Sequence, residues 1–156
     1  MTGQPQLSQV AEAAIQRVHF IHWVDHEIDR FTPGLEDALA CGMPDGLRTH
    51  SMADLKSMVI NNEAQMWTTE NGVCICTMSR YPQSSIYEVW LMAGDFDELM
   101  TKWFATVQEY ARKCGASLMY VRGRKGWTRR LLSRGFKQGH STTCLDLREN
   151  NGTTIQ

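Results

Sequence analysis

The sequence has 156 residues, of which 42% are hydrophobic and 21% charged, with a formal net charge of −1; this composition excludes a disordered tail or a fibrous repeat and fits one globular domain. The near-zero net charge argues against nucleic-acid binding over the whole surface. No apolar run approaches the roughly 20 residues of a membrane-spanning helix and residues 1–9 lack signal-peptide features, so we expect no membrane partner and a product that stays in the cytoplasm that makes it.

Residues 1–50 are expected to form an N-terminal helical region that packs on the core or extends from it. An amphipathic helix is predicted from Leu7 to about Arg30, with Ser8 as its N-cap. The apolar face follows the helical spacing of Val10, Ala14, Val18, Ile21 and His22. Pro33-Gly34 should end this helix because proline and glycine both disfavour helix interiors.

A turn-rich stretch separates this region from the rest of the chain. Residues 35–41 are expected to make one or two helical turns, and residues 42–46 a loop. Ser51 followed by Asp54 is typical of a capping box, which predicts a helix ending near Asn61-Asn62. The apolar face of this helix would be Leu55, Met58 and Val59.

Strand patterns begin at Gln65. Residues 65–69 and 73–79 flank Asn71-Gly72, which predicts an antiparallel hairpin whose two turn positions adopt positive φ. A third strand is expected over residues 86–92, which continues the meander.

A long helix is predicted from about Phe96 to Lys113 and should end at Cys114-Gly115. Its buried stripe would consist of Leu99, Trp103, Val107 and Tyr110, with Met100, Phe104 and Ala111 alongside. The apolar residues 117–121 should then form a strand parallel to residues 86–92, which makes a right-handed βαβ crossover.

The last predicted helix spans about Trp127 to Ser133 and ends at Arg134-Gly135, and residues 136–147 should supply one or two antiparallel strands. The predicted fold class is therefore α/β (α+β): a mixed sheet with an antiparallel hairpin meander, a βαβ crossover and an N-terminal helical region. Residues 51–148 would form the core domain and residues 149–156 a polar tail.

Cysteine and histidine spacing points to no metal site. The five cysteines are odd in number and never spaced as CxxC, so we expect reduced, packed thiols. His22 and His26 lie four residues apart on one helical face, which could hold a metal ion, but no HExxH pattern or cysteine set accompanies them. A solvated helix face is the favoured interpretation.

The segments VWLMAGDFDELMTKW and YARKCGASLMYVRGRKGWTRRLLSRGF resemble small GNAT-like proteins encoded by tailed bacteriophages. The order of predicted elements over residues 51–147 is likewise that of the GNAT acetyltransferase superfamily. The more specific of the shared motifs is Gly123-Arg124-Lys125-Gly126-Trp127. This resemblance implies a virion protein of a short-tailed phage, carried inside the particle or at the head-to-tail junction and made in the host bacterial cytoplasm.

The resemblance also implies where acetyl-CoA would bind in a working member of the superfamily. The cofactor pyrophosphate would meet the turn at Ala93, Gly94 and Asp95, but the glycine pattern of that turn is missing here. Asp95, Asp97 and Glu98 also place three carboxylates where phosphates would need free amide donors. We therefore expect no cofactor.

The catalytic residues of the superfamily are only partly present. Alignment on Gly135-Phe136 puts Arg124 at the family's asparagine and Leu131 at its general-acid tyrosine. Glu88 could serve as a general base if it points between the strands, or it could face solvent. We therefore predict no catalytic residue, with Glu88 as the candidate if the protein is an enzyme.

Positive charge is concentrated between Ser117 and Leu145, where no Asp or Glu occurs. The predicted interaction patch consists of Arg122, Arg124, Lys125, Trp127, Arg129, Arg130 and Arg134. These arginines could be solvated, could dock an acidic partner protein, or could bind a phosphate backbone. Trp127 could offer a stacking platform, or be half-buried packing or an interface anchor. The remainder of the chain is more acidic, which would suit head-to-tail assembly of identical copies.

Together these features predict a non-enzymatic virion protein with a degenerate GNAT-like fold that works through protein contacts. Its partners would be other virion proteins, namely portal, adaptor or internal core proteins, in an oligomeric assembly. Two alternatives stay open: an N-acyltransferase that uses acetyl-CoA, and a DNA-contacting packaging module.

Overall fold

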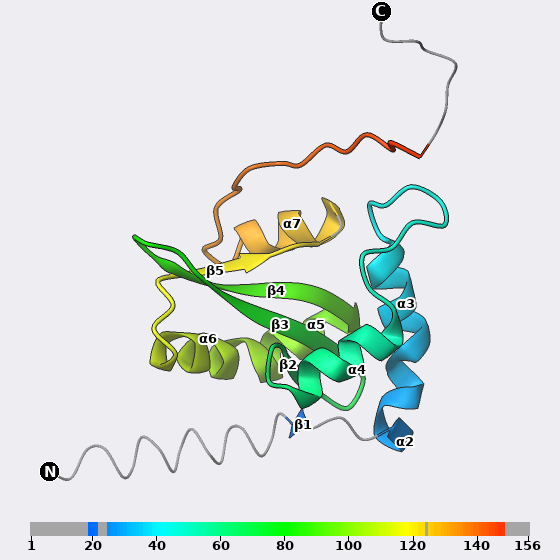
Figure 1. Cartoon of the computed structure of the whole chain (residues 1–156). Coiled ribbons are helices and arrows are strands. Elements are labelled where there is room, and N and C mark those ends of the chain that lie inside the picture. The colour runs from blue at the N-terminus through cyan, green and yellow to red at the C-terminus, as the bar shows by residue number, and fades with distance from the viewer. Residues whose placement is uncertain (1–18, 22–24, 124, 149–156) are drawn as a thin grey trace, which may run out of the picture.

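The computed structural model describes residues 19–21, 25–123 and 125–148. Five strands form one sheet in the order β1-β2-β3-β4-β5 (Figure 1). They are β1 (His19–Ile21), β2 (Gln65–Thr68), β3 (Gly72–Arg80), β4 (Ser85–Gly94) and β5 (Leu118–Val121). Neighbouring strands are antiparallel except β4 and β5, which are parallel. The predicted hairpin, meander and βαβ crossover are therefore confirmed.

Helices cover both faces of the sheet. One group comprises α2 (Asp25–Ile28), the 3₁₀ helix η1 (Asp29–Phe31), α3 (Thr32–Ala40) and α4 (Met52–Ile60). The other comprises α5 (Phe96–Glu98), the π-helical segment η2 (Leu99–Trp103), α6 (Phe104–Lys113) and α7 (Lys125–Leu132). None of the helices in the described part of the chain is long and apolar enough to cross a membrane.

Two apolar cores result, one on each face. The segments α5, η2 and α6 follow one another without a gap and make up the predicted long helix. Its buried stripe, which includes Trp103 and Val107, packs on strand residues Trp67, Tyr87 and Val89. On the other face, residues 28–39 and α4 pack on Met66, Val73 and Ile75. Since α2, η1 and α3 share this second core with β2–β4, the described part of the N-terminal region is packed on the sheet.

Helix α4 begins as the sequence predicts. The Ser51 hydroxyl accepts a hydrogen bond from the Asp54 N–H at 3.1 Å, and the Asp54 carboxylate accepts one from the Ser51 N–H at 2.8 Å. This reciprocal pair satisfies two amide donors that a helix leaves without an intrahelical partner. It lowers the pKa of Asp54, chiefly through the bond from the Ser51 backbone.

The hairpin is confirmed, but its turn is not of the expected kind. Among the described residues, only Asn62 and certain glycines have positive φ, and neither Asn71 nor Gly72 is one of them. Residues 70–71 form the connection, closed by a 2.9 Å hydrogen bond from the Thr69 N–H to the Gly72 carbonyl. Gly72 starts β3, where a β-carbon would lie 2.6 Å from Leu99, so close packing explains this glycine.

The predicted helix from Leu7 to Arg30 is wrong over residues 19–21, which form β1 and pair with β2. Residues 7–18 and 22–24, His22 included, lie outside the described residues. The open edge of β2 supplies backbone partners that helical spacing in the sequence cannot reveal. Pro33 does not break a helix but sits in the first turn of α3, where its missing N–H costs no hydrogen bond.

The predicted strands over residues 136–147 are also wrong. Phe136 is held by a 3.3 Å bond to the Leu131 carbonyl, but in the described part of the chain no backbone hydrogen bond joins residues 137–147 to another segment. The segment runs away from β5 towards the loop after α3 (Figure 1). There the Arg148 guanidinium donates to the Asp45 carbonyl at 3.1 Å. A strand forms only beside a partner strand, and the segment has none here.

Candidate functional site

The candidate site lies at the carboxyl end of β4, where β4 and β5 diverge. The strands pair from Ile86 and Leu118 to Val89 and Val121, and the last bond joins the Arg122 N–H to the Val89 carbonyl at 3.1 Å. Trp90 is an extra residue in β4, because the pairing with β3 shifts between Ile75 and Cys76. A bulge bends a strand and increases its twist, so β4 leaves β5 from this residue onwards.

Side chains of helix α7 bridge the diverging strands. The Trp127 ring lies 5.7 Å from the Phe96 ring, measured between centroids, and packs so close to Gly123 that a β-carbon there would meet the indole at 2.8 Å. The Arg130 guanidinium lies over the Phe96 ring, 4.3 Å from its centroid. Leu131, only 4% exposed, completes the cluster. Phe96, Trp127 and Leu131 thus belong to one apolar cluster beside the diverging strands.

Trp127 is therefore packing at the site, and not a free stacking platform. Of the nearby side chains on β4, Met92 faces the core under the long helix, whereas Trp90 packs on the opposite face of the sheet against His50. In the sequence, Gly123 four residues before Trp127 could have indicated this contact, because a glycine lets a large ring approach the backbone closely.

The turn at Ala93, Gly94 and Asp95 is joined to the hairpin loop. Gly94 has φ +93°, and a β-carbon on it would lie 2.1 Å from the Asn71 carbonyl oxygen. The Asp95 N–H donates to that same oxygen at 2.9 Å. An amide that a pyrophosphate would need is thus already bonded within the protein.

The three carboxylates after Gly94 each have a partner within the chain. Asp95 caps the helix by accepting from the Glu98 N–H at 3.1 Å, and Asp97 forms an ion pair with Arg130. Glu98 accepts from the Asn71 N–H at 3.1 Å and from the Asn71 side-chain amide at 3.0 Å. Burial alone would raise the pKa of Glu98, but the hydrogen bonds from Asn71 and Thr69 and the charge of Lys102 together outweigh it and lower that pKa. These carboxylates make the start of the helix negatively charged, which disfavours the binding of a polyanion such as pyrophosphate there.

Glu88, the candidate general base, lies in β4 beside Tyr120 of β5 and has a side chain 15% exposed. Its Oε1 atom forms an ion pair with the Arg122 guanidinium. A substrate amine would therefore have to displace a cation already in place. Leu131, at the position aligned with the family's tyrosine, is buried and has no hydroxyl. Arg124, aligned with the asparagine, lies outside the described residues.

The predicted basic patch contains arginines with and without an ion pair to another described residue. Arg122 and Arg130 form the ion pairs with Glu88 and Asp97. Arg129 and Arg134 are exposed, and neither has an ion pair with another described residue. Lys125 begins α7. All four arginines are exposed, and Arg129 and Arg134 are the two whose charge is not balanced by an ion pair with a described residue.

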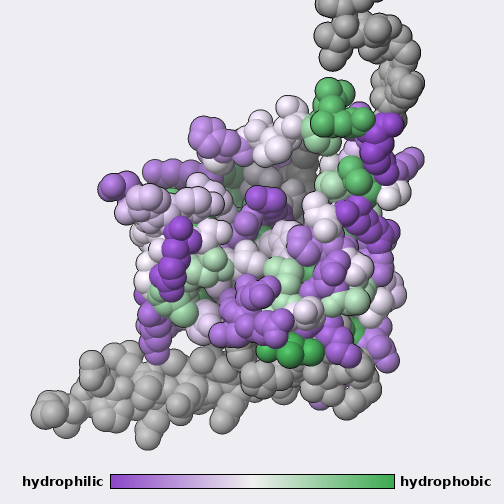
Figure 2. Space-filling view, viewed as in Figure 1, coloured by the Kyte–Doolittle hydropathy of each residue, from purple (hydrophilic) through white to green (hydrophobic). Residues whose placement is uncertain are grey.

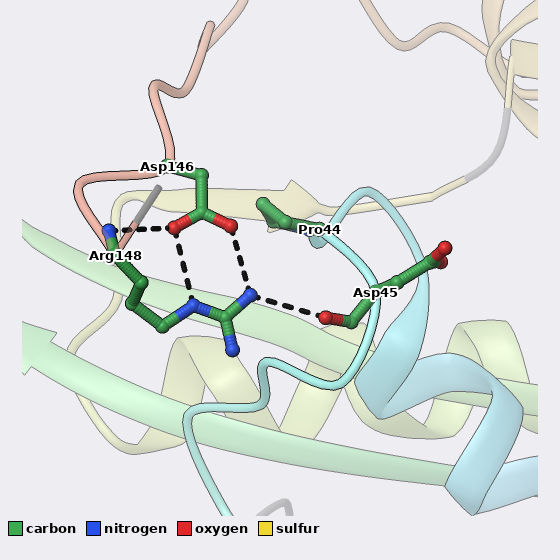
Figure 3. Close-up of a pocket in the computed structure, with 4 residues that line it drawn as sticks. All are labelled: Pro44, Asp45, Asp146 and Arg148. Atoms are coloured by element: carbon green, nitrogen blue, oxygen red, sulfur yellow. Dashed lines mark hydrogen bonds and ion pairs between the residues drawn. The ribbon is translucent and has the colours of Figure 1, made fainter. Parts of the chain in front are cut away.

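An open surface pocket of roughly 410 Å³ lies elsewhere, between the loop after α3 and the C-terminal segment. Pro44, Asp45, Asp146 and Arg148 line it (Figure 3). The Arg148 guanidinium donates to both Asp146 oxygens, at 3.1 and 2.8 Å, and to the Asp45 carbonyl. The bond to Asp45 holds the segment to the loop and the bonds to Asp146 brace the segment itself, so we assign this pocket a structural role.

Cysteines offer no reactive centre in the described core. Cys74 and Cys76 are fully buried, and burial raises the pKa of both thiols. Within the described residues, no three His, Cys, Asp or Glu side chains are grouped so that they could hold a metal ion.

Comparison with solved structures identifies the fold. A transcriptional regulator from Bacillus halodurans matches with a TM-score of 0.60 at 13% identity, covering 83% of this chain and 99% of that one. An acetyltransferase from Trypanosoma brucei matches at 0.55 and 12%, covering 84% and 97%. The protein TTHA1254 from Thermus thermophilus matches at 0.54 and 16%, covering 85% and 99%.

These matches show that the chain has a GNAT-like fold, as the sequence predicts. No protein-family model and no curated protein matches the sequence.

Proposed function

We propose that this chain is a GNAT-fold protein that binds other proteins and does not transfer acetyl groups, and that it serves in the virion of a tailed bacteriophage. The observation that carries the proposal is the Trp127–Phe96 contact together with the ion-paired Asp97 and Arg130. Phe96 and Asp97 directly follow the turn at residues 93–95, where the resemblance places the cofactor pyrophosphate, and these contacts support the absence of a cofactor. The residues present do not fit that cofactor.

The protein-binding half of the proposal is supported by the surface of α7. Arg129 and Arg134 keep their charges exposed, whereas the remaining carboxylates at the helix start are bound within the chain. Exposed arginines beside an aromatic residue are typical of surfaces that dock acidic protein partners. The virion location depends on the resemblance of the GRKGW motif to phage proteins.

Coenzyme A binding gives the direct test. A ligand at a hundred times its dissociation constant stabilises a protein by about 2.7 kcal/mol, which thermal unfolding detects easily. We expect no change in the melting temperature with coenzyme A or acetyl-CoA, while an acetyltransferase measured in parallel shifts upwards. A saturable shift for this chain would overturn the loss of cofactor binding.

The virion location needs its own measurement. Mass spectrometry of purified particles, produced by the phage that encodes this sequence, should detect the chain at a constant ratio to the major capsid protein. Detection only in the infected-cell lysate, and never in particles, would contradict the location.

The acyltransferase alternative rests on one specific observation, the bulge at Trp90 with the divergence of β4 from β5. Glu88 would then be the base and residues 93–95 the cofactor loop. An acetyl-transfer assay on amine substrates, with Glu88→Gln as the paired variant, tests it. Turnover in the wild type that is lost in the variant would favour this alternative.

The DNA-contacting alternative rests on the exposed Arg129 and Arg134. Phosphate contacts release counterions, so affinity for duplex DNA would fall steeply as salt is raised. Filter binding across a salt series should show only weak retention of DNA under our proposal. Tight binding with a steep salt slope, reduced in Arg129→Ala, would favour the DNA role.

A further inference from the structure

Two exposed cysteines lie where the C-terminal segment crosses the loop after α3. Cys41 directly follows the last residue of α3, Cys144 lies on the segment after α7, and both are exposed. The Cys144 thiol donates a hydrogen bond to the Gly42 carbonyl, with a sulfur–oxygen distance of 3.8 Å. Cys144 therefore contacts the residue next to Cys41 in the chain, and the Cα atoms of neighbouring residues are only about 3.8 Å apart.

A second contact holds the same two segments together. The Arg148 guanidinium donates to the Asp45 carbonyl at 3.1 Å, and Figure 3 shows this bond beside the ion pair with Asp146. The segment therefore meets the loop at two places, which keeps Cys144 close to the end of α3. Figure 2 shows the segment and the loop at the surface of the molecule, where a small reagent in solution can reach them.

The two cysteines can be joined without disturbing either apolar core. A disulfide needs Cα atoms about 4.4 to 6.8 Å apart. The Cys41 backbone is fixed at the end of α3 by the bond from its N–H to the Ala38 carbonyl at 3.3 Å. In the described part of the chain no backbone hydrogen bond joins residues 137–147 to another segment, so Cys144 can move towards Cys41 without breaking a strand or a helix.

The other cysteines are poorly placed to compete for these two thiols. Cys74 and Cys76 are fully buried in the core under the long helix. Cys114 follows the end of α6, which packs on the opposite face of the sheet from α3. Within one copy of the chain, Cys41 and Cys144 are therefore the favoured pair.

We infer that Cys41 and Cys144 are a modification site, at which an intramolecular disulfide forms when the chain meets a low-molecular-weight disulfide such as oxidised glutathione. The thiolate of one cysteine attacks a sulfur atom of the oxidant and releases one glutathione, and the thiolate of the other attacks the mixed disulfide and releases the second. The protein thiols give up two electrons and two protons, which the two released glutathione thiols carry away. This inference does not depend on the proposed loss of coenzyme A binding or on the virion location.

Peptide mapping without reduction detects the bond. The full chain is incubated in a glutathione redox buffer, the remaining thiols are alkylated, and the protein is digested with trypsin. Trypsin releases residues 31–48 and residues 138–148, and each of these peptides contains one cysteine. We expect the two peptides to appear as one cross-linked species that reduction separates.

The fold should favour the bond over chance encounter. In the unfolded chain the two cysteines close a loop of about 100 residues, so their thiols meet rarely. The equilibrium constant for forming the bond with glutathione should be at least about tenfold higher in buffer than in urea, and the oxidised chain should melt at a higher temperature than the reduced chain. Equal constants in buffer and in urea would overturn the inference.

Two variants identify the cysteines involved. Cys144→Ser should abolish the cross-link and leave Cys41 with a glutathione adduct, whereas Cys114→Ser should leave the cross-link unchanged. Both positions lie outside the fully buried core, so the variants should fold. Glutathione adducts on both cysteines of the folded wild type without a cross-link, or cross-links only between two copies, would contradict the assignment.

Discussion

The indole ring of Trp127 lies against the phenyl ring of Phe96, with centroids 5.7 Å apart and planes inclined by 33°. This contact joins α7 to the start of the long helix across the diverging ends of β4 and β5. The ring comes from the helix that also carries Arg129 and Arg130. Packing and the proposed loss of cofactor binding therefore depend on the same side chain.

Replacing this ring should cost stability. Trp127 is only partly buried, so Trp127→Ala should lower the free energy of unfolding by about 2 kcal/mol, less than the 3–5 kcal/mol of a fully buried tryptophan. Urea unfolding at neutral pH measures this. Tyr81→Ala removes an aromatic ring that is 57% exposed and should change stability by less than about 0.5 kcal/mol. Equal losses in both variants would contradict the packing role.

Gly94 should tolerate no side chain. Its φ of +93° and the 2.1 Å approach of the Asn71 oxygen to a β-carbon mean that Gly94→Ala must strain the backbone and separate the hairpin loop from the turn. We expect a loss of at least about 2 kcal/mol. Gly126→Ala is the matched control, because nothing lies within 4 Å and the helical position favours alanine by up to about 1 kcal/mol.

A buried hydroxyl links two strands and should be costly to remove. Tyr87 donates to the Gln65 side-chain oxygen at 2.9 Å and accepts from the Trp67 indole N–H at 3.2 Å. Tyr87→Phe keeps the ring but takes a partner from each of these buried groups, so stability should fall by about 1–3 kcal/mol. Tyr81→Phe, at the surface, should be neutral. Thermal unfolding compares the two, and a neutral Tyr87→Phe would argue against the network.

Acid should weaken the link between the hairpin loop and the long helix. Since the pKa of folded Glu98 lies below its unfolded value of 4.5, the Asn71 hydrogen bonds contribute stability above pH 4.5, and this contribution is lost as the pH falls through the folded pKa. Glu98→Gln should therefore be less stable than the wild type at pH 7, and the difference should shrink below pH 4.5. Urea unfolding of both proteins at pH 7 and at pH 3 measures this, and a difference that stays constant between the two pH values would contradict the role of the Asn71 hydrogen bonds.

The residues that the sequence placed correctly are those whose structure depends on near neighbours. The Ser51–Asp54 capping box, the end of the long helix at Gly115 and the end of α7 at Gly135 are confirmed, because each is decided within a few residues. The parallel βαβ crossover is confirmed because the order of strand, helix and strand can be read directly from the chain. The GNAT-like fold follows from these local units in sequence.

Only the tertiary structure decided which partner each remaining side chain meets. Glu88 could have been a free base or a surface charge, and the fold gives it Arg122 as a counter-ion. Residues 19–21 became a strand because β2 offered an open edge, while residues 136–147 remained without a ladder because no strand of the described part of the chain pairs with them. Local sequence sets backbone preferences of a few tenths of a kcal/mol per residue, but a strand or an ion pair exists only when distant residues are brought together.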